Sequence, residues 1–411
     1  MDHVQGLSVF WDIHAIMFGF LSGVPSRLRH ILSGFRRHFT RPQFENFCRT
    51  MLGLIVAGEG EHDVKSINEL FIERKDQSTL NRFLTHSKWS VEQVVSEGKA
   101  LLLSEGRTSD MVEYKVIDDT VCRKYSPRTE MVCYNHSSTM GTVLSHDYVT
   151  SLYVNGDAAL PDGLKLYGSE KKCREKGVEF KTKVQLACEM IDEHTPRARQ
   201  TIWLWDSWYT MYDIVTRCRA HGYDWIGEMK SNRVVFYEGK KYHLNELVDK
   251  LRSEGMFSDV FIDGEIYQAC KVRVFTKKLG EASIVVNVKA DTRDVHMLCT
   301  DLTCGTEEIV RHALERHRIE DFHKGAKYLG LGEYRFRESE AALIHAHLVS
   351  LAYTLLDVLR RKLLRYGIVK SLPSLEGTVE WVRRKAMHLF IHTVKDATKP
   401  IRSLLRMIDT G

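Results

Sequence analysis

IWLWDSWY, residues 202–209, joins an apolar run to an acid and then to the start of a polar, helix-like segment. The apolar run is typical of a strand, and residues 211–221 carry a helical pattern. We therefore expect an α/β sheet with Asp206 at a strand end, where side chains reach the edge that binds ligands in such sheets. The alternative is that Asp206 only caps a helix beginning near Tyr209.

A second acid follows an apolar strand pattern earlier in the chain. Residues 111–117 alternate as a strand does, and VIDDT, residues 116–120, places Asp118 and Asp119 at its end. An isolated acid there is as well explained by a solvated strand end or an Asx-turn. Two strand-end acids in one domain favour a shared site.

The third acid lies in a helical pattern. Residues 307–325 predict one helix, on which RHRIEDFHKGAK, residues 316–327, places Arg316, Glu320, Lys324 and Lys327 on one face. Such a face can be a solvated ladder of ion pairs. It can also hold a metal ion through Glu320 while the cations meet phosphates.

Three separated carboxylates suit phosphodiester chemistry. Two divalent ions about 3.5–4 Å apart can activate a nucleophile and stabilise a leaving oxygen. Mg²⁺ prefers oxygen ligands and keeps several waters, so a few carboxylates and substrate phosphates suffice. Mn²⁺ is expected to substitute for Mg²⁺.

These motifs together resemble the DDE transposases of prokaryotic insertion sequences, in the RNase H-like superfamily. The resemblance is to the group with the signature Y-x2-R-x3-E-x6-K, which places the arginine on Arg316, the glutamate on Glu320 and the lysine on Lys327. The tyrosine position falls on Ala313 and departs from the pattern. The D-x-[ST] context selects Asp118 over Asp119 as the first acid.

The resemblance implies a function. Asp118 would bridge two metal ions, Asp206 and Glu320 would each complete one, and Arg316 and Lys327 would orient phosphate. The enzyme would bind double-stranded DNA at the ends of a mobile element, cleave it, and join 3′-hydroxyl ends to target DNA, acting as a homodimer. A nuclease or resolvase without strand transfer and a non-enzymatic DNA-binding regulator derived from a transposase are the alternatives.

The expected architecture is an α/β, RNase H-like catalytic domain, a mixed sheet flanked by helices, with a β-rich insertion and helical regions at both ends. Residues 1–108 are predicted to be an N-terminal helical DNA-binding region. The catalytic domain is expected in two parts, 109–236 and 301–350, separated by the β-rich insertion 237–300. Residues 351–411 are predicted to be a C-terminal helical region. Helix candidates 64–73 and 79–84, with Ser78 as N-cap, fit a helix-turn-helix or a plain αα-corner.

Other residues are candidates for DNA contact. Lys230 and Arg233 follow a strand and could hold the backbone, or form a polar turn. Lys324 shares the face of Glu320, and Trp208 could stack on an unpaired base or belong to the core. Basic runs at 360–365 and 383–385 are solvated helix faces or phosphate tracks.

The bulk composition fits a soluble, multidomain protein. The chain has 411 residues, a formal net charge of +5 and nine scattered cysteines, which we expect to be free thiols in a reducing cytosol. Residues 341–358 are apolar enough for a membrane-spanning helix, but their histidines and Asp357 favour a buried helix of a soluble domain. We expect no nucleotide cofactor, because a Walker loop is absent, and a cytoplasmic, nucleoid-associated location.

Overall fold

The computed structural model describes residues 21–409 except 138, 290 and 292–293. The chain divides into two compact units. The first contains residues up to Glu105, the short segment Arg128–Glu130 and the chain from Lys324 onward; the second contains Gly106–Pro127 and Met131–His323.

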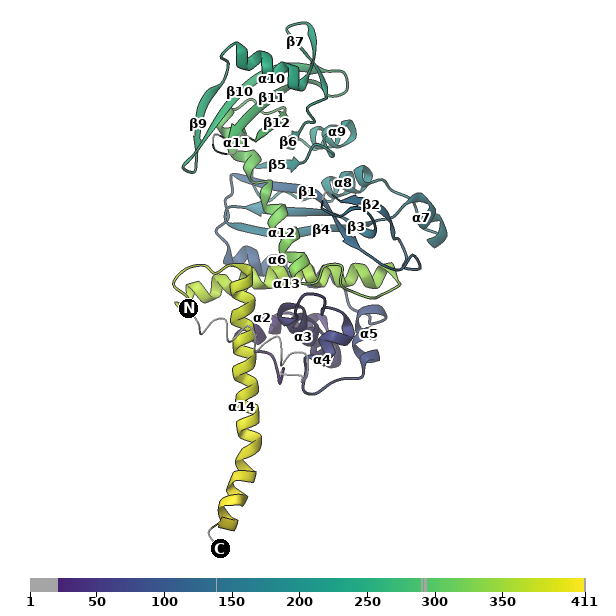
Figure 1. Cartoon of the computed structure of the whole chain (residues 1–411), viewed down its shortest axis with the longest axis vertical. Coiled ribbons are helices and arrows are strands. Elements are labelled where there is room, and N and C mark those ends of the chain that lie inside the picture. The colour runs from purple at the N-terminus through teal and green to yellow at the C-terminus, as the bar shows by residue number, and fades with distance from the viewer. Residues whose placement is uncertain (1–20, 138, 290, 292–293, 410–411) are drawn as a thin grey trace. The chain divides into compact units, whose positions relative to one another are not determined.

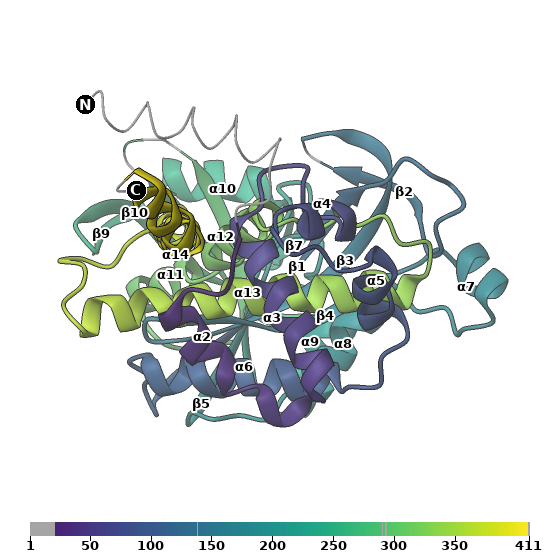
Figure 2. The same ribbon diagram turned by 90° about the horizontal axis from the view of Figure 1, so that it is seen from below.

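The first unit is helical (Figure 1). Its elements are α2 (Ser26–Ser33), the 3₁₀ turn η1 (Arg36–His38), α3 (Arg41–Val56), α4 (Val64–Glu69), α5 (Gln77–Thr85), α6 (Val91–Glu105), α13 (Ser339–Arg365) and α14 (Leu375–Asp409). The central helix α13 packs against α2, α3, α5 and α6, as Figure 2 shows. Helices from the two ends of the chain therefore share one core.

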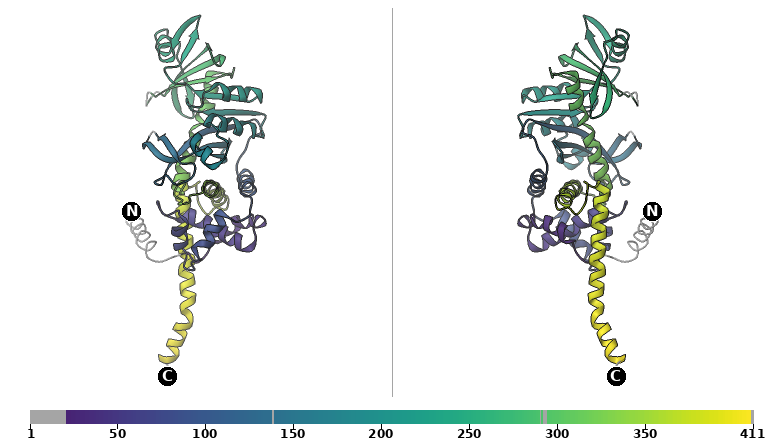
Figure 3. Two further views of the ribbon diagram at one scale, coloured as in Figure 1. Left: turned by 90° about the vertical axis from the view of Figure 1, so that its right-hand side faces the viewer. Right: turned by 90° about the vertical axis from the view of Figure 1, so that its left-hand side faces the viewer.

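Two predictions about these helices need correction. The N-cap of α5 is Asp76, whose carboxylate accepts a hydrogen bond from the backbone N–H of Ser78 at 2.7 Å, so Ser78 lies inside the helix. Within the expected C-terminal helical region the sequence pattern predicts separate helices over 378–395 and 400–408, but these residues lie in the single helix α14, which continues past the other helices of its unit (Figure 3). Pro400 does not end it, although proline removes a helical hydrogen bond.

Helix α13 contains the apolar stretch that we considered as a membrane-spanning helix. It is long and apolar enough to cross a membrane, but most of its most apolar stretch is buried inside the protein. Its buried side chains include Leu351, Leu355 and Leu359. This burial is what a core helix of a soluble domain shows.

The second unit is a mixed α/β fold with twelve strands in one sheet within the described residues. The strands are β1 (Val112–Arg123), β2 (Cys133–Ser137), β3 (Gly141–Asn155), β4 (Ala158–Tyr167), β5 (Gln200–Trp205), β6 (Asp224–Glu228), β7 (Val234–Tyr237), β8 (Lys240–His243), β9 (Ser258–Ile262), β10 (Glu265–Thr276), β11 (Gly280–Lys289) and β12 (Val295–Thr300). Their order is β2-β3-β1-β5-β6-β12-β11-β10-β7-β8, with β4 beside β3 and β9 beside β10. The pairs β1–β5 and β5–β6 are parallel, and the other pairs are antiparallel.

The helices of this unit are α7 (Glu170–Lys176), α8 (Lys183–Asp192), α9 (Tyr212–Ala220), α10 (Leu244–Ser253), α11 (Thr306–Leu314) and the start of α12 (His317–Tyr328). Apolar residues of α8, α9 and α10 form one core with Ile117, Trp203 and Trp205 of the sheet. The sheet is mixed and flanked by helices, and most of the chain from β7 to β12 is in strands. This confirms the predicted α/β fold class and is consistent with an RNase H-like domain.

Candidate active site

Asp118 and Asp206 lie side by side on neighbouring strands. The parallel pairing of β1 with β5 ends at Ile117 opposite Trp205, and each acid is the next residue on its strand. Adjacent strands are about 4.8 Å apart, so the register alone brings the two carboxylates together. The prediction that Asp118 ends a strand is wrong, because β1 continues to Arg123. It is the partner strand β5 that ends here.

A further acid, Glu228, continues this row. β6 pairs with β5 so that Gly227 lies opposite Trp205, and Glu228 is the following residue. Asp118, Asp206 and Glu228 therefore occupy the same level on three adjacent parallel strands. Glu228 was not among the predicted site residues, although an acid closing the apolar strand 225–227 was the available signal.

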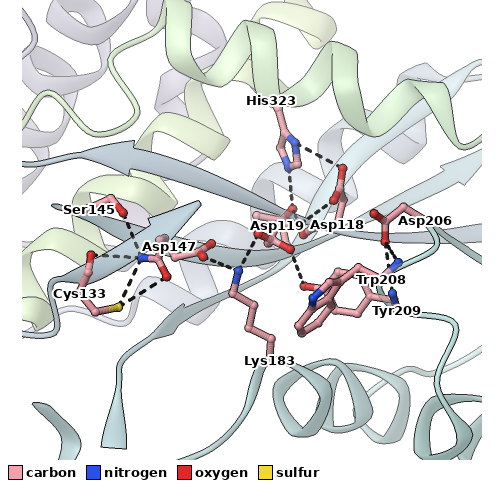
Figure 4. A network of polar contacts seen from close by, with 12 residues as sticks. Asp118, Asp119, Cys133, Ser145, Asp147, Lys183, Asp206, Trp208, Tyr209 and His323 are labelled. Carbon is pink, nitrogen blue, oxygen red and sulfur yellow. Dashed lines mark hydrogen bonds and ion pairs between the residues drawn. The ribbon is translucent and has the colours of Figure 1, made fainter. Parts of the chain in front are cut away.

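Helix α12 covers the face of the sheet on which Asp118 lies. The ring nitrogen Nε2 of His323 is 2.8 Å from the Thr150 hydroxyl on β3, and Nδ1 is 4.0 Å from Oδ2 of Asp118 (Figure 4). Glu320 lies less than one turn before His323 on α12. Its carboxylate is half exposed, 3.1 Å from Nη1 of Arg316 and 3.6 Å from Nδ1 of His317.

Arg316 connects two carboxylates. Its Nε lies 3.5 Å from Glu228 and its Nη1 lies 3.1 Å from Glu320, with 14% of the side chain exposed. The predicted single helix 307–325 is two helices, and Arg316 lies in the break between α11 and α12. The i,i+4 spacing to Glu320 still brings the two charges together, as the sequence predicts.

The surroundings of Asp118 and Asp206 disfavour the ionised form of both carboxyl groups in the absence of a cation. Burial, followed by the charges of Asp119 and Asp206, raises the pKa of Asp118 to about 7. Burial also raises the pKa of Asp206, against hydrogen bonds from two backbone amides that lower it. A divalent cation would remove this repulsion, and the oxygen donors are those that Mg²⁺ or Mn²⁺ accepts.

Asp206 is held by the turn that follows it. Its Oδ1 accepts hydrogen bonds from the backbone N–H groups of Trp208 at 2.9 Å and Tyr209 at 3.2 Å. The next helix, α9, begins only at Tyr212 and has Met211 at its N-cap. The alternative that Asp206 caps a helix beginning near Tyr209 is therefore wrong, and the turn instead fixes the direction of the carboxylate.

Asp119 points to the opposite face of β1 from Asp118, because successive side chains of a strand alternate. Its Oδ2 accepts a hydrogen bond from Nζ of Lys183 at 2.8 Å, and its Oδ1 accepts one from the Tyr209 hydroxyl at 3.1 Å. Lys183 also pairs with the fully buried Asp147 on β3 (Figure 4). Neither Lys183 nor Asp147 was among the predicted site residues.

The remaining predicted contacts lie on several elements. Lys230 is exposed and Arg233 half-buried in the turn after β6, where the Arg233 N–H donates to the Lys230 carbonyl at 3.0 Å. Lys324 and Lys327 are exposed on the part of α12 that belongs to the helical unit. Trp208 is 37% exposed, and its ring centroid is 5.6 Å from Nζ of Lys183.

Ala313, at the signature tyrosine position, lines a cavity of about 370 Å³. Arg316, Glu228 and His296 line the same cavity. His296 Nδ1 is 3.3 Å from Glu228, and this contact raises the pKa of His296. A small residue at position 313 thus leaves open space beside Arg316 and Glu228.

Two family models match the chain. Residues 34–246 match the model described as DDE superfamily endonuclease. Residues 164–361 match the model of the archaeal ISC1217 transposase. The first match includes Asp118 and Asp206, and the second includes Asp206 and Glu320. No curated protein matches the chain.

Proposed function

The chain belongs to the DDE superfamily of endonucleases, as a DDE transposase of insertion sequences, and we propose that Asp118, Asp206 and Glu320 form its catalytic centre. The observation that supports this most strongly is the register of β1 and β5, which places the first two acids next to each other as a half-buried pair whose negative charges repel. Glu320 would join them from α12, on which His323, three residues later, lies 4.0 Å from Asp118.

Two divalent ions, Mg²⁺ or Mn²⁺, would be held with Asp118 as the shared ligand and Asp206 and Glu320 as one ligand each. Such ions supply activation of the attacking oxygen and stabilisation of the leaving oxygen. The protein contributes fixed ligands: the backbone amides after Asp206 orient its carboxylate, and Arg316 orients Glu320. Preorganised ligands avoid a reorganisation cost during the reaction.

Arg316 has a second role in this proposal. Its guanidinium lies between Glu228 and Glu320 and carries a fixed positive charge at the metal site. A planar guanidinium can bind a phosphate oxygen through a remaining N–H while it keeps a carboxylate partner. Lys327, Lys324, Lys230, Arg233 and Trp208 are proposed to extend this contact along the DNA.

DNA binding by the helical unit completes the proposal. Helices α4 and α5 are short, as in a helix-turn-helix, and α5 exposes Ser78, Asn81 and Arg82. We assign them to recognition of the element ends, with cleavage followed by transfer of the 3′-hydroxyl end into target DNA. Two ends must meet for this reaction, so the active form is proposed to be a homodimer on DNA in the cytoplasm, associated with the nucleoid.

The test uses the inverted repeats that flank the gene as substrate, a supercoiled plasmid as target, and Mg²⁺ or Mn²⁺. Glu320→Gln and Asp206→Asn should abolish cleavage, whereas Asp321→Asn, a neighbouring exposed acid of α12, should cleave as the wild type does. Normal cleavage by folded Glu320→Gln would contradict the assignment. Cleavage without a joined product would identify a nuclease or resolvase instead.

A further inference from the structure

A second pair of acids, distinct from the proposed metal ligands, lies on the other face of β1. Asp147 on β3 is paired with Val121, two residues after Asp119, so the two carboxylates share one face. Asp147 is completely buried. Lys183 Nζ lies between them, hydrogen-bonded to Asp119 at 2.8 Å and ion-paired with Asp147 (Figure 4).

The desolvation free energy of these buried charges indicates that the cluster has a role other than stabilising the fold. Lys183 is only 17% exposed, and taking both partners out of water costs more than a surface ion pair returns. Well-packed apolar residues of similar volume are often as stabilising as a buried ion pair. The fold nevertheless places Lys183 firmly: it is the first residue of α8, whose N-cap Thr182 forms a capping box with Gln185.

Tyr209 connects this cluster to the proposed metal site. Its hydroxyl donates to Oδ1 of Asp119 at 3.1 Å, while its backbone N–H donates to Oδ1 of Asp206 at 3.2 Å. The ring is fully buried, so the two hydrogen bonds lie at the ends of one immobile residue. An unbroken path of contacts runs from Lys183 through Asp119 and Tyr209 to Asp206.

Lys183 also reaches the same turn by a shorter route. Its Nζ is 5.6 Å from the centroid of the Trp208 ring, a distance at which a cation is attracted to an aromatic face. The backbone N–H of Trp208 donates the other hydrogen bond to Asp206, at 2.9 Å. Both residues that hold the Asp206 carboxylate are therefore tied to one ammonium group.

We propose that Lys183 is a positioning residue: it holds Asp119 and through it Tyr209, it contacts the Trp208 ring directly, and it thereby fixes the Asp206 carboxylate in the orientation that binds a metal ion. This inference rests on the proposed function of Asp206. Partners that orient metal ligands without touching the metal typically contribute 10–100-fold to metal affinity or activity. Lys183→Met should therefore weaken divalent-ion binding without removing any ligand.

Lys165 provides a matched control. It bridges two carboxylates, Glu189 at 2.8 Å and Glu193 at 2.6 Å, and is 21% exposed. It resembles Lys183 in charge, in its own exposure and in its number of partners, but those partners lie on α8 and at its C-cap, are more exposed, and are outside the path to Asp206. Lys165→Met should keep the metal affinity of the wild type, and it should lose less stability than Lys183→Met because its partners remain in contact with water.

The experiment measures Mn²⁺ binding to the full-length protein by electron paramagnetic resonance, and DNA cleavage as a function of Mn²⁺ concentration. Lys183→Met should bind Mn²⁺ at least about tenfold more weakly, with cleavage restored at high Mn²⁺, and Lys183→Arg should recover part of the affinity. Equal Mn²⁺ affinity in Lys183→Met and Lys165→Met would overturn the inference.

Two further variants keep the outcome decisive. Tyr209→Phe removes only the hydroxyl that joins Asp119 to the turn, and should also weaken Mn²⁺ binding; unchanged affinity there would refute the path even if Lys183→Met fails to fold. Asp206→Asn tests the premise separately. If Asp206→Asn binds Mn²⁺ as the wild type does, the proposed function has failed, whatever Lys183 does.

Discussion

Replacing Asp118 with Asn should make the metal-free protein more stable at alkaline pH. The folded state raises the pKa of this carboxyl from 3.8 to about 7, through burial and the neighbouring acids Asp119 and Asp206. Because the folded pKa lies above the unfolded one, ionising the carboxyl costs the folded state free energy. The cost is absent below pH 3.8, grows as the pH rises, and is constant above pH 7.

The size of the effect follows from the same two values. At about 1.4 kcal/mol per pKa unit, the shift from 3.8 to about 7 corresponds to roughly 4 kcal/mol at pH 8. At pH 5 the cost falls to roughly 1.6 kcal/mol, because most of the folded carboxyls are protonated. An amide of the same shape avoids the cost, so Asp118→Asn should gain up to about 4 kcal/mol at pH 8.

Urea unfolding in EDTA at pH 8 and pH 5 measures both values, with Asp321→Asn as an exposed control. Adding Mn²⁺ should then stabilise the wild type and leave Asp118→Asn unchanged, because a ligand stabilises only the state that binds it. A variant that is no more stable than the wild type at pH 8 would refute the reasoning. So would a stability gain that is equal at the two pH values.

Three further predictions concern the same strands. Mn²⁺ affinity should fall about tenfold for each pH unit below 7, as a proton competes for Asp118, and level off above pH 7, as calorimetry over pH 5.5–8.5 would measure. Glu228→Gln removes one of the two carboxylates that hold Arg316, and should slow cleavage about tenfold with little loss of stability, as rate assays and urea unfolding would show. Gly227→Ala places a Cβ 2.3 Å from Nε1 of Trp205 and should cost about 1–3 kcal/mol of unfolding free energy, again by urea unfolding.

Local patterns were sufficient to predict the strand before Asp206 and the contact between Arg316 and Glu320. Both depend on residues close in sequence: an apolar run that ends at residue 205, and an i,i+4 spacing at the start of a helix. The fold class follows from the same kind of pattern, because strands and helices differ in apolar period.

Features that depend on distant pairing could not be predicted. Asp118 lies at an open edge because β5 stops beside it, although its own strand continues. Glu228 becomes part of the site through the register of β6 and the side chain of Arg316. Lys183 has no local motif at all, since its partners come from β1 and β3, more than thirty residues away.

The most direct test of the central claim is the anomalous X-ray scattering of Mn²⁺ in crystals of the protein bound to its DNA ends. Two peaks about 3.5–4 Å apart are predicted, with Asp118 bound to both, Asp206 to one and Glu320 to the other. Peaks elsewhere in a complex that cleaves its DNA, or a site that Glu228 completes in place of Glu320, would contradict the account.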